Sequence, residues 1–421
     1  MKKVGVALLG LGTVGGGTYR ILTSMREDIK ASDGVDIEIR RIIERDRSKA
    51  EALGIDPSLL STDINDVISD PEIGIVAEFF GGIEPARSFL IASLKAGKSI
   101  VTANKEMFAK CMEDLKAAAI EGNAGLYFEA SCVGGVPVIR ALTESMQGNR
   151  IDSIIGIVNG TTNYILTKMA DEGLDYADVL KEAQRLGYAE ANPSADVDGF
   201  DSMYKLSILS TLCFRKHVPL DKIYREGISK ISKIDIEYGK LFGYTLKLLA
   251  IGRKVDGKIE ARVHPAFVSN DNPLASVKGS FNAVLIHGNN VGDVMLYGRG
   301  AGDLPTGSAI VSDIVYAAVQ DKHRLFSYNS VVTDEDFAVD FEGEYYVRMT
   351  VADKAGVLAK IASSFGKYGV SIHSVQQQAE EGKASIIFMI HRTSESALNK
   401  AAAEIASFND VYEVNTIIRV I

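Results

Sequence analysis

Four carboxylates and one lysine gather in residues 187–206, and side chains of these types can bind and deprotonate a polar substrate. The carboxylates are those of Glu190, Asp196, Asp198 and Asp201. Turn-forming residues predict a loop up to about Asp198, and the apolar pattern that follows predicts a helix. Asp201 and Lys205 would then lie one turn apart on the same helix face. Such a pair could hold a zwitterionic substrate and move a proton, or could be a solvated surface ion pair.

A second chemical motif lies at the start of the chain, where a short apolar run is followed by three spaced glycines. Residues 4–9 predict a buried strand, and residues 13–29 predict a helix. Between them, Gly10, Gly12 and Gly15 form the GxGxxG pattern, which suits a tight turn, close approach of a pyrophosphate and close helix packing. The motif therefore predicts a dinucleotide site, with a glycine-rich turn that binds no ligand as the alternative.

Further strands predict a parallel sheet around this site, of the Rossmann type. The strand at residues 36–43 leads into Glu44 and Arg45, where the ribose 2′ position is read. An acid there favours NAD and an arginine favours NADP, so the choice stays open with a slight preference for NADP. Strands at residues 73–80 and 99–102 end at Gly81 and Lys105, and we expect both residues to face the cofactor.

The middle of the chain predicts a substrate domain of mixed helices and strands. Glu129 precedes a turn with two glycines, and the carbonyls of Cys132, Gly134 and Val136 could join it around a hard cation. A purely structural turn is the alternative. A strand at residues 154–158 leads to Gly160 and exposed amides that suit polar recognition. A glycine-rich loop at residues 298–307 precedes an apolar helix, at about residues 308–325, that we expect to return to the nucleotide domain.

The C-terminal segment reads as a separate α+β module. Residues 344–421 show the order βαββαβ, which is the ferredoxin-like arrangement. Residues 328–343 are mixed and polar and predict a linker. We therefore expect an α/β protein with a Rossmann-type domain at residues 1–130, a substrate and dimerisation domain at 131–307 and a ferredoxin-like domain at 344–421.

Composition narrows the class of partner and the compartment. The net charge is −9 without a basic block, which argues against nucleic acid. No apolar run approaches the roughly 18 residues that span a bilayer, so we expect no membrane partner. Three scattered cysteines fit a reducing cytoplasm better than a disulfide framework or a zinc site.

In their order along the chain, these motifs resemble the homoserine dehydrogenase family over nearly the whole length. The matching stretches are GLGTVGGG at residues 10–17, TANK at 102–105, EASCVGGVP at 129–137, NGTTNYIL at 159–166, GYAEANPSADVDGFDSMYK at 187–205 and GRGAGDLPTGSA at 298–309. The resemblance implies reversible NAD(P)-dependent interconversion of L-homoserine and L-aspartate 4-semialdehyde, on the route to threonine and methionine. Rival readings are a related dehydrogenase, such as aspartate dehydrogenase, and a nucleotide-sensing protein without catalysis.

The resemblance also implies roles for individual residues. Lys205 would be the acid/base at the substrate oxygen, and Lys105 would lie against cofactor and substrate. Residues expected to hold the substrate are Glu190, Asp201, Asp196, Tyr188 and Gly160. Residues expected to contact NADP or NAD are Gly10, Gly12, Thr13, Val14, Gly15, Arg45, Gly81, Lys105 and Gly302. The turn of Glu129, Cys132, Gly134 and Val136 would hold a sodium ion, with Cys132 contributing its carbonyl where the family often has valine.

The C-terminal module resembles an ACT domain, because the stretch Asp-Lys-Ala-Gly-Val-Leu at residues 353–358 stands in the βαββαβ order. ACT domains bind small effectors and usually pair with a second copy. Threonine is therefore the expected effector, with simple dimerisation as the alternative, and we expect a homo-oligomer.

Overall fold

A parallel sheet occupies the N-terminal third of the chain in the computed structural model, which describes residues 1–320 and 325–421. Its strand order is β3-β2-β1-β4-β5-β6, and every pairing is parallel. The strands are β1 (Lys2–Leu9), β2 (Val35–Ile43), β3 (Leu60–Ser61), β4 (Ile73–Glu78), β5 (Ser99–Thr102) and β6 (Leu126–Tyr127). The carboxyl ends of these strands therefore share one edge, where a doubly wound sheet binds its ligand.

Helices cover both faces of this sheet. They are α1 (Thr13–Ser24), α2 (Arg26–Asp33), α3 (Arg47–Ala52), α4 (Asn65–Ile68), α5 (Ala86–Lys95), α6 (Lys105–Glu121) and α13 (Asp303–Val319). The single helix predicted at residues 13–29 is wrong, because the backbone breaks at Met25 and two helices replace it. The helix predicted at about residues 308–325 begins earlier, at Asp303, and ends at Val319; residues 321–324 lie outside the described residues.

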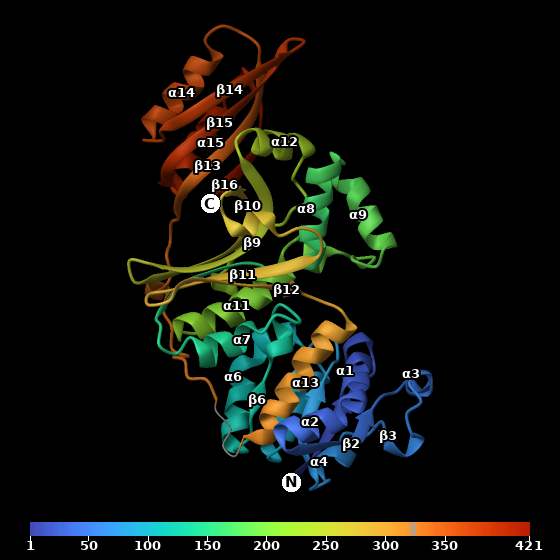
Figure 1. The fold of residues 1–421 in the computed structure, drawn as a ribbon. Coiled ribbons are helices and arrows are strands. Elements are labelled where there is room, and N and C mark those ends of the chain that lie inside the picture. The colour runs from blue at the N-terminus through green and yellow to red at the C-terminus, as the bar shows by residue number, and fades with distance from the viewer. Residues whose placement is uncertain (321–324) are drawn as a thin grey trace.

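Helix α13 brings a late part of the chain back onto the N-terminal domain, as expected. It lies beside α1 in the lower lobe of Figure 1. The two helices approach so closely that a Cβ on Gly17 would lie 2.3 Å from the Asp303 carbonyl oxygen. Buried Ile310 and Ile314 pack α13 into the core of the nucleotide domain. Helix α13 thus ties the glycine turn to the loop that carries Gly302.

A second, mixed sheet runs through the middle of the molecule and continues into the C-terminal module. Its main path is β12-β11-β7-β9-β10-β16-β13-β15-β14, and β8 pairs with β10. Its strands in the middle domain are β7 (Ile151–Ile157), β8 (Tyr224–Arg225), β9 (Tyr244–Val255), β10 (Lys258–Ser269), β11 (Phe281–Gly288) and β12 (Gly292–Arg299). The accompanying helices are α7 (Val138–Arg140), α8 (Gly160–Glu172), α9 (Tyr176–Arg185), α10 (Ser194–Val197), α11 (Phe200–Phe214) and α12 (Lys233–Leu241).

The C-terminal module has the predicted βαββαβ order. Its elements are β13 (Glu342–Ala352), α14 (Val357–Lys367), β14 (Ile372–Glu380), β15 (Lys383–Ser394), α15 (Glu395–Ala406) and β16 (Val411–Val420). This module is joined to the middle domain through its sheet, because Ala266 and Phe267 of β10 pair with Arg419 and Val420 of β16. The two domains therefore share one continuous sheet, which the sequence pattern did not indicate (Figure 1).

Two isolated β-bridges hold the connecting segment against the middle domain, namely Lys216 with Asn329 and Ile259 with Phe337.

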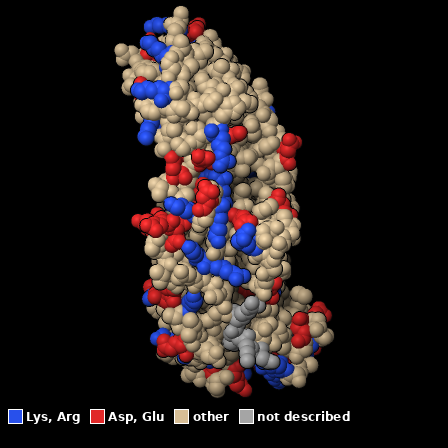
Figure 2. Space-filling model, turned by 90° about the vertical axis from the view of Figure 1, so that its left-hand side faces the viewer, with Lys and Arg blue, Asp and Glu red and all other residues tan. Residues whose placement is uncertain are grey.

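Basic and acidic side chains are interspersed over the face drawn in Figure 2. Within residues 1–320 and 325–421, every helix is too short or too polar to span a bilayer.

Candidate active site

The glycine turn after β1 has the geometry that close approach of a phosphate requires. Gly10 has a φ of +104°, which a side chain would strain, and a Cβ on Gly15 would lie 2.2 Å from the Gly10 carbonyl oxygen. Gly12 stands at the N-cap of α1, and a Cβ there would meet only open space. Thr13 and Val14 form the first turn of α1, so their amides lie at the helix N-terminus, where an anion is favoured.

The end of β2 shows which groups remain available for the ribose. The Glu44 carboxylate accepts hydrogen bonds from the backbone amides of Leu11, Arg45 and Asp46, at 2.8, 2.9 and 3.0 Å. Burial works against the charge on Glu44, but the amides of Asp46 and Leu11, together with Lys49, nevertheless lower its pKa. Glu44 therefore holds the glycine turn to the end of β2, while the Arg45 side chain is exposed.

A cluster of two lysines and one aspartate lies where α6 meets α11. Lys205 Nζ is 2.6 Å from Asp201 Oδ2 and donates a second hydrogen bond of 2.6 Å to the Val158 carbonyl oxygen. Lys105 Nζ lies 3.2 Å from the other oxygen, Asp201 Oδ1. Asp201 and Lys205 are 6% and 8% exposed, so the solvated surface pair that was the alternative is excluded. Lys105 comes from the first turn of α6 and remains partly exposed.

Charge balance inside this cluster fixes the state of Asp201. Burial opposes its ionisation, but the ammonium groups of Lys205 and Lys105 outweigh that cost and hold the pKa of Asp201 well below its usual range. In return, the charge of Asp201 raises the pKa of Lys105 despite partial desolvation. Asp201 is thus a permanent anion that binds both lysines.

Asn159 links the acidic loop to the cluster. Its side-chain nitrogen donates to Asp196 Oδ1 at 2.7 Å and to Asp201 Oδ2 at 2.9 Å. Its side-chain oxygen caps α8 by accepting from the Thr162 amide at 2.9 Å. Burial raises the pKa of Asp196, although the hydrogen bond from Asn159 works in the opposite direction. One carboxamide therefore positions two carboxylates at the start of α8.

The other expected substrate residues lie on the outer side of this loop. Glu190 and Tyr188 are both exposed, and the Tyr188 ring packs on Tyr164 with centroids 4.7 Å apart. Gly160 is the first residue of α8, where a Cβ would lie 2.8 Å from the Ser280 carbonyl oxygen.

Two further glycines were expected to contact the cofactor. Gly302 has a φ of +123° and stands at the N-cap of α13, and a Cβ on Gly81 would meet only open space.

The turn after Glu129 is buried and offers mostly backbone oxygens. Glu129 Oε1 and Oε2 accept from the amides of Ile139 and Arg140, both at 2.8 Å, and burial raises the pKa of Glu129. Burial also raises the pKa of the Cys132 thiol to about 12, so this residue would offer its carbonyl rather than a thiolate. Among the described residues, no three His, Cys, Asp or Glu side chains come close enough to hold a metal by themselves.

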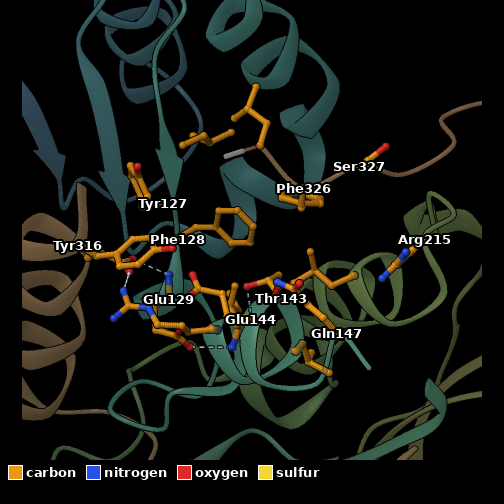
Figure 3. Close-up of a pocket in the computed structure, with 17 residues that line it drawn as sticks. Tyr127, Phe128, Glu129, Thr143, Glu144, Gln147, Arg215, Tyr316, Phe326 and Ser327 are labelled. Carbon is orange, nitrogen blue, oxygen red and sulfur yellow. Dashed lines mark hydrogen bonds and ion pairs between the residues drawn. The ribbon is translucent and has the colours of Figure 1, made fainter. Parts of the chain in front are cut away.

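A cavity of about 440 Å³ lies beside Glu129, on the side of α7 and α13 (Figure 3). Tyr127, Phe128 and Tyr316 line it, together with Glu129. Neither Lys105 nor Lys205 is among its described lining residues, so this cavity is separate from the lysine–aspartate cluster.

Comparison with known proteins matches every part of the chain. Family models match residues 10–129 as "Homoserine dehydrogenase, NAD binding domain", residues 137–315 as "Homoserine dehydrogenase" and residues 345–410 as "ACT domain". A homoserine dehydrogenase of Corynebacterium glutamicum is 42% identical over 99% of this chain and 96% of its own length. One from Bacillus subtilis is 38% identical over 100% of this chain and 99% of its own length.

The solved structures agree with this result. A homoserine dehydrogenase from Thiobacillus denitrificans aligns with a TM-score of 0.93 and 40% identity, covering 100% of this chain and 99% of that one. A hyperthermophilic archaeal homoserine dehydrogenase in complex with NADPH aligns with a TM-score of 0.66 and 31% identity, covering 76% of this chain and 100% of that one.

The chain belongs to the homoserine dehydrogenase family. It is an NAD(P)-dependent oxidoreductase of amino-acid biosynthesis with a C-terminal ACT domain. The predicted fold class is confirmed. Because full-length relatives of this chain are homoserine dehydrogenases, the alternative predictions of an aspartate dehydrogenase and of a non-catalytic sensor are wrong.

Sequence reasoning did not single out two groups that bind the lysine–aspartate cluster. These are the Val158 carbonyl and the Asn159 carboxamide. Asn159 could have been found from its place directly after a strand and three residues before Thr162, which is an N-cap pattern. The carbonyl of Val158 carries no signal in its residue type.

Proposed function

We propose that Lys205 is the acid/base of homoserine oxidation. The observation that carries this is the geometry of its ammonium group, which donates to Asp201 and Val158. An ammonium has three N–H donors, so one remains for the substrate oxygen. When bound, NAD(P) supplies the hydride acceptor. Lys205 in its amine form would take the proton of the homoserine hydroxyl group as the hydride leaves the carbon that bears this hydroxyl. In the reverse reaction, the ammonium of Lys205 would return that proton to the oxygen.

The raised pKa of Lys105 supports a different role for the second lysine. Because Asp201 keeps Lys105 positively charged, we propose that Lys105 orients the substrate and stabilises negative charge on its oxygen. Asp201 holds both ammonium groups at the substrate end of the site. The partly exposed side chain of Lys105 also connects this buried aspartate to solvent.

We propose that the acidic loop binds the amino-acid part of L-homoserine. Glu190 is exposed, and Asp196 uses one oxygen for Asn159, so both retain oxygens for a substrate ammonium group. Tyr188 and Gly160 lie on the same loop and on the adjoining helix start.

We propose NADP as the preferred cofactor. The Glu44 carboxylate is occupied by three backbone amides, so it is poorly placed to select NAD through the ribose hydroxyl. The exposed guanidinium of Arg45 next to it suits a 2′-phosphate. The glycine turn, Gly81 and Gly302 complete the proposed cofactor contacts.

We also propose a structural sodium ion at the Glu129 turn. Glu129 is a buried carboxylate, and the backbone of Val133 and Gly134 adopts positive φ, which turns successive peptide groups of the loop. Oxygen donors of this kind suit a hard cation. The donors would be Glu129 and the carbonyls of Cys132, Gly134 and Val136.

Threonine is the effector that we propose for the ACT domain, and contacts across the shared sheet support a route to the active site. Arg419 of β16 binds Glu226 at 2.8 Å. Next to Glu226, the Arg225 guanidinium donates to the Asp198 carbonyl, and the Ile228 amide donates to the Val197 carbonyl at 2.8 Å. The ACT domain is thus linked, through the segment at residues 225–228, to the acidic loop that we propose binds the substrate.

The edge strands support our proposal of a homo-oligomer. Strands β12 and β14 end the larger sheet, and within the described chain each pairs on one side only. Unpaired edges of this kind favour pairing with another chain.

We propose three domains. The nucleotide domain comprises residues 1–130 with α13, the middle domain comprises residues 131–307, and the ACT domain comprises residues 344–421, with residues 328–343 as the linker.

The proposed role of Lys205 is tested by Lys205→Met with a matched control. Lys98→Met removes another buried lysine, whose ammonium donates to the carbonyls of Asp70 and Ile73 at 2.7 and 2.8 Å, away from the cluster. In an assay of L-homoserine oxidation at 340 nm, we expect Lys205→Met to lower kcat by roughly 10²–10⁴-fold. Lys98→Met should keep kcat, and cofactor binding should survive in both variants. Near-normal turnover of Lys205→Met would remove Lys205 from the mechanism.

A further inference from the structure

A fully buried carboxyl lies beneath the cofactor edge of the parallel sheet. Glu78 is the last residue of β4 and is 0% exposed. Glu78 Oε1 accepts a hydrogen bond of 2.6 Å from the Phe80 amide, and Oε2 accepts one of 2.5 Å from the Thr102 hydroxyl at the end of β5. One carboxyl therefore joins the ends of two neighbouring strands.

The hydrogen bonds continue from Thr102 into the turn before α6. Thr102 Oγ1 accepts from the Asn104 amide at 3.0 Å. The Asn104 side chain donates to the carbonyl oxygens of Phe80 and Gly82, at 3.1 and 2.7 Å, and caps α6 by accepting from the Met107 amide at 3.1 Å. The loop after β4 and the turn after β5 thus form one hydrogen-bonded unit that closes on Glu78.

One side of this unit forms the wall of the glycine turn. A Cβ on Gly10 would lie 3.4 Å from the Phe80 ring, and a Cβ on Gly15 would lie 3.0 Å from the Phe79 ring. The loop that Glu78 holds therefore packs directly on the glycines that suit the pyrophosphate. A shift of this loop would move the wall of the cofactor cleft.

The other side of the unit carries Lys105. This lysine directly follows the capping residue Asn104, and its ammonium lies 3.2 Å from Asp201 Oδ1. The direction of the Lys105 side chain depends on how the first turn of α6 is capped, and the cap depends on Asn104 and Thr102. Glu78 is thus connected to both the cofactor wall and the lysine cluster.

We propose that Glu78 is a positioning residue that sets Lys105 and the Phe79–Gly82 loop in one fixed relation. This inference rests on the proposed place of Lys105 between cofactor and substrate. The reaction needs hydride donor, hydride acceptor and proton carrier aligned together, and displacement by about 1 Å costs roughly 10²-fold in rate. A single buried carboxyl with two strong hydrogen bonds keeps the two sides in register.

The charge state of Glu78 supports this role. Burial raises the pKa of Glu78 to about 7, although the Thr102 hydroxyl, the Phe80 amide and the Asn104 side chain all work in the opposite direction. These three groups are neutral. The ionised carboxylate accepts from both Phe80 and Thr102. In the protonated acid one oxygen becomes a donor, so the bond with Thr102 would have to reverse its direction, although Thr102 Oγ1 already accepts from the Asn104 amide. The unit should therefore loosen as pH falls below about 7.

Two variants test the proposal from opposite ends, with kcat, KM for the cofactor and the pH profile as readouts. Glu78→Gln keeps the size of the side chain but not its two acceptors, and Thr102→Val removes the bridging hydroxyl. We expect each of these two variants to lower kcat by roughly 10–100-fold. Thr102→Ser retains the hydroxyl group, so its kcat should stay within about threefold of that of the wild type. The limb of kcat/KM that falls below about pH 7 should be absent in Glu78→Gln.

Thr18→Val is the matched control. Thr18 is equally buried in the nucleotide domain, and its hydroxyl has no hydrogen-bond partner within the described part of the chain. This variant should keep kcat. Unchanged kcat in a folded Thr102→Val protein, or an equal loss in Thr18→Val, would overturn the proposal. An acid limb that persists unaltered in Glu78→Gln would also overturn it.

Lys105→Met separates this proposal from the one on which it rests. If Lys105→Met keeps its turnover, the proposed place of Lys105 is wrong. If Lys105→Met loses turnover while Glu78→Gln and Thr102→Val do not, only the positioning role of Glu78 fails. The effects of Glu78→Gln and Thr102→Val should be less than additive in the double variant, because both break the same unit.

Discussion

Asp201→Asn removes the one negative charge that two lysines share, and its cost follows from the geometry. The pair with Lys205 is buried, at 2.6 Å, whereas the pair with Lys105 is longer, at 3.2 Å, and partly exposed. Removing one partner of a buried pair costs about 3–5 kcal/mol, and an exposed pair contributes about 0–1 kcal/mol. The loss of stability should therefore come almost entirely from Lys205, whose buried ammonium would keep its hydrogen bond to the Val158 carbonyl but lose its counter-charge.

Thermal unfolding of the cofactor-free protein measures this cost. A loss of 3–5 kcal/mol lowers the melting temperature of a domain of this size by roughly 6–20 °C. Asp196→Asn is the matched control, because the Asp196 carboxylate accepts a hydrogen bond from the neutral Asn159, so the loss of stability should be much smaller. The double variant Asp201→Asn/Lys205→Met removes both buried charges, and it should regain most of the stability but none of the turnover.

The pH dependence of stability gives the same test a second readout. The pKa of Asp201 is lower in the folded protein than in the unfolded chain, so its contribution is present above its unfolded pKa and is lost as pH falls through its folded pKa. Asp201→Asn should therefore lose more stability at neutral pH than in acid. A melting temperature within about 2 °C of wild type at pH 7 would refute the claim that Asp201 carries the cluster.

Three further predictions concern substrate, cofactor and effector. Glu190→Ala should mainly raise the KM for L-homoserine in steady-state assays, because its exposed carboxylate is proposed to bind the substrate ammonium; an unchanged KM would contradict that role. Arg45→Ala should raise the KM for NADPH by about tenfold or more and leave that for NADH nearly unaltered, since only NADPH has the 2′-phosphate. L-Threonine should lower the rate and release heat on mixing, and Arg419→Gln should weaken the effect on the rate while binding persists, because it breaks the contact with Glu226. No heat and no change in rate would leave the ACT domain with a dimerisation role alone.

Several features of the site could be predicted because they are local. The glycine turn depends on a strand, a few backbone dihedrals and a helix start, all within residues 4–24, and the observed φ of Gly10 agrees with that reading. Asp201 and Lys205 meet because any helix brings residues i and i+4 together. The helix predicted across residues 13–29 failed at Met25, since element ends depend on packing as well as on periodicity.

The sequence by itself determined the elements, their order and the residue types that could do chemistry here, because periodicity and turn chemistry act over a few neighbouring positions. Only the tertiary structure decided that Lys105 meets Asp201, that Glu44 is occupied by the Leu11 amide, and that β16 joins the sheet of the middle domain. These contacts join segments that are distant along the chain, and strand register and helix packing set their distances. If the strand register or the helix packing were shifted by one residue, the same residue types would no longer bring the lysines and the carboxylates into contact.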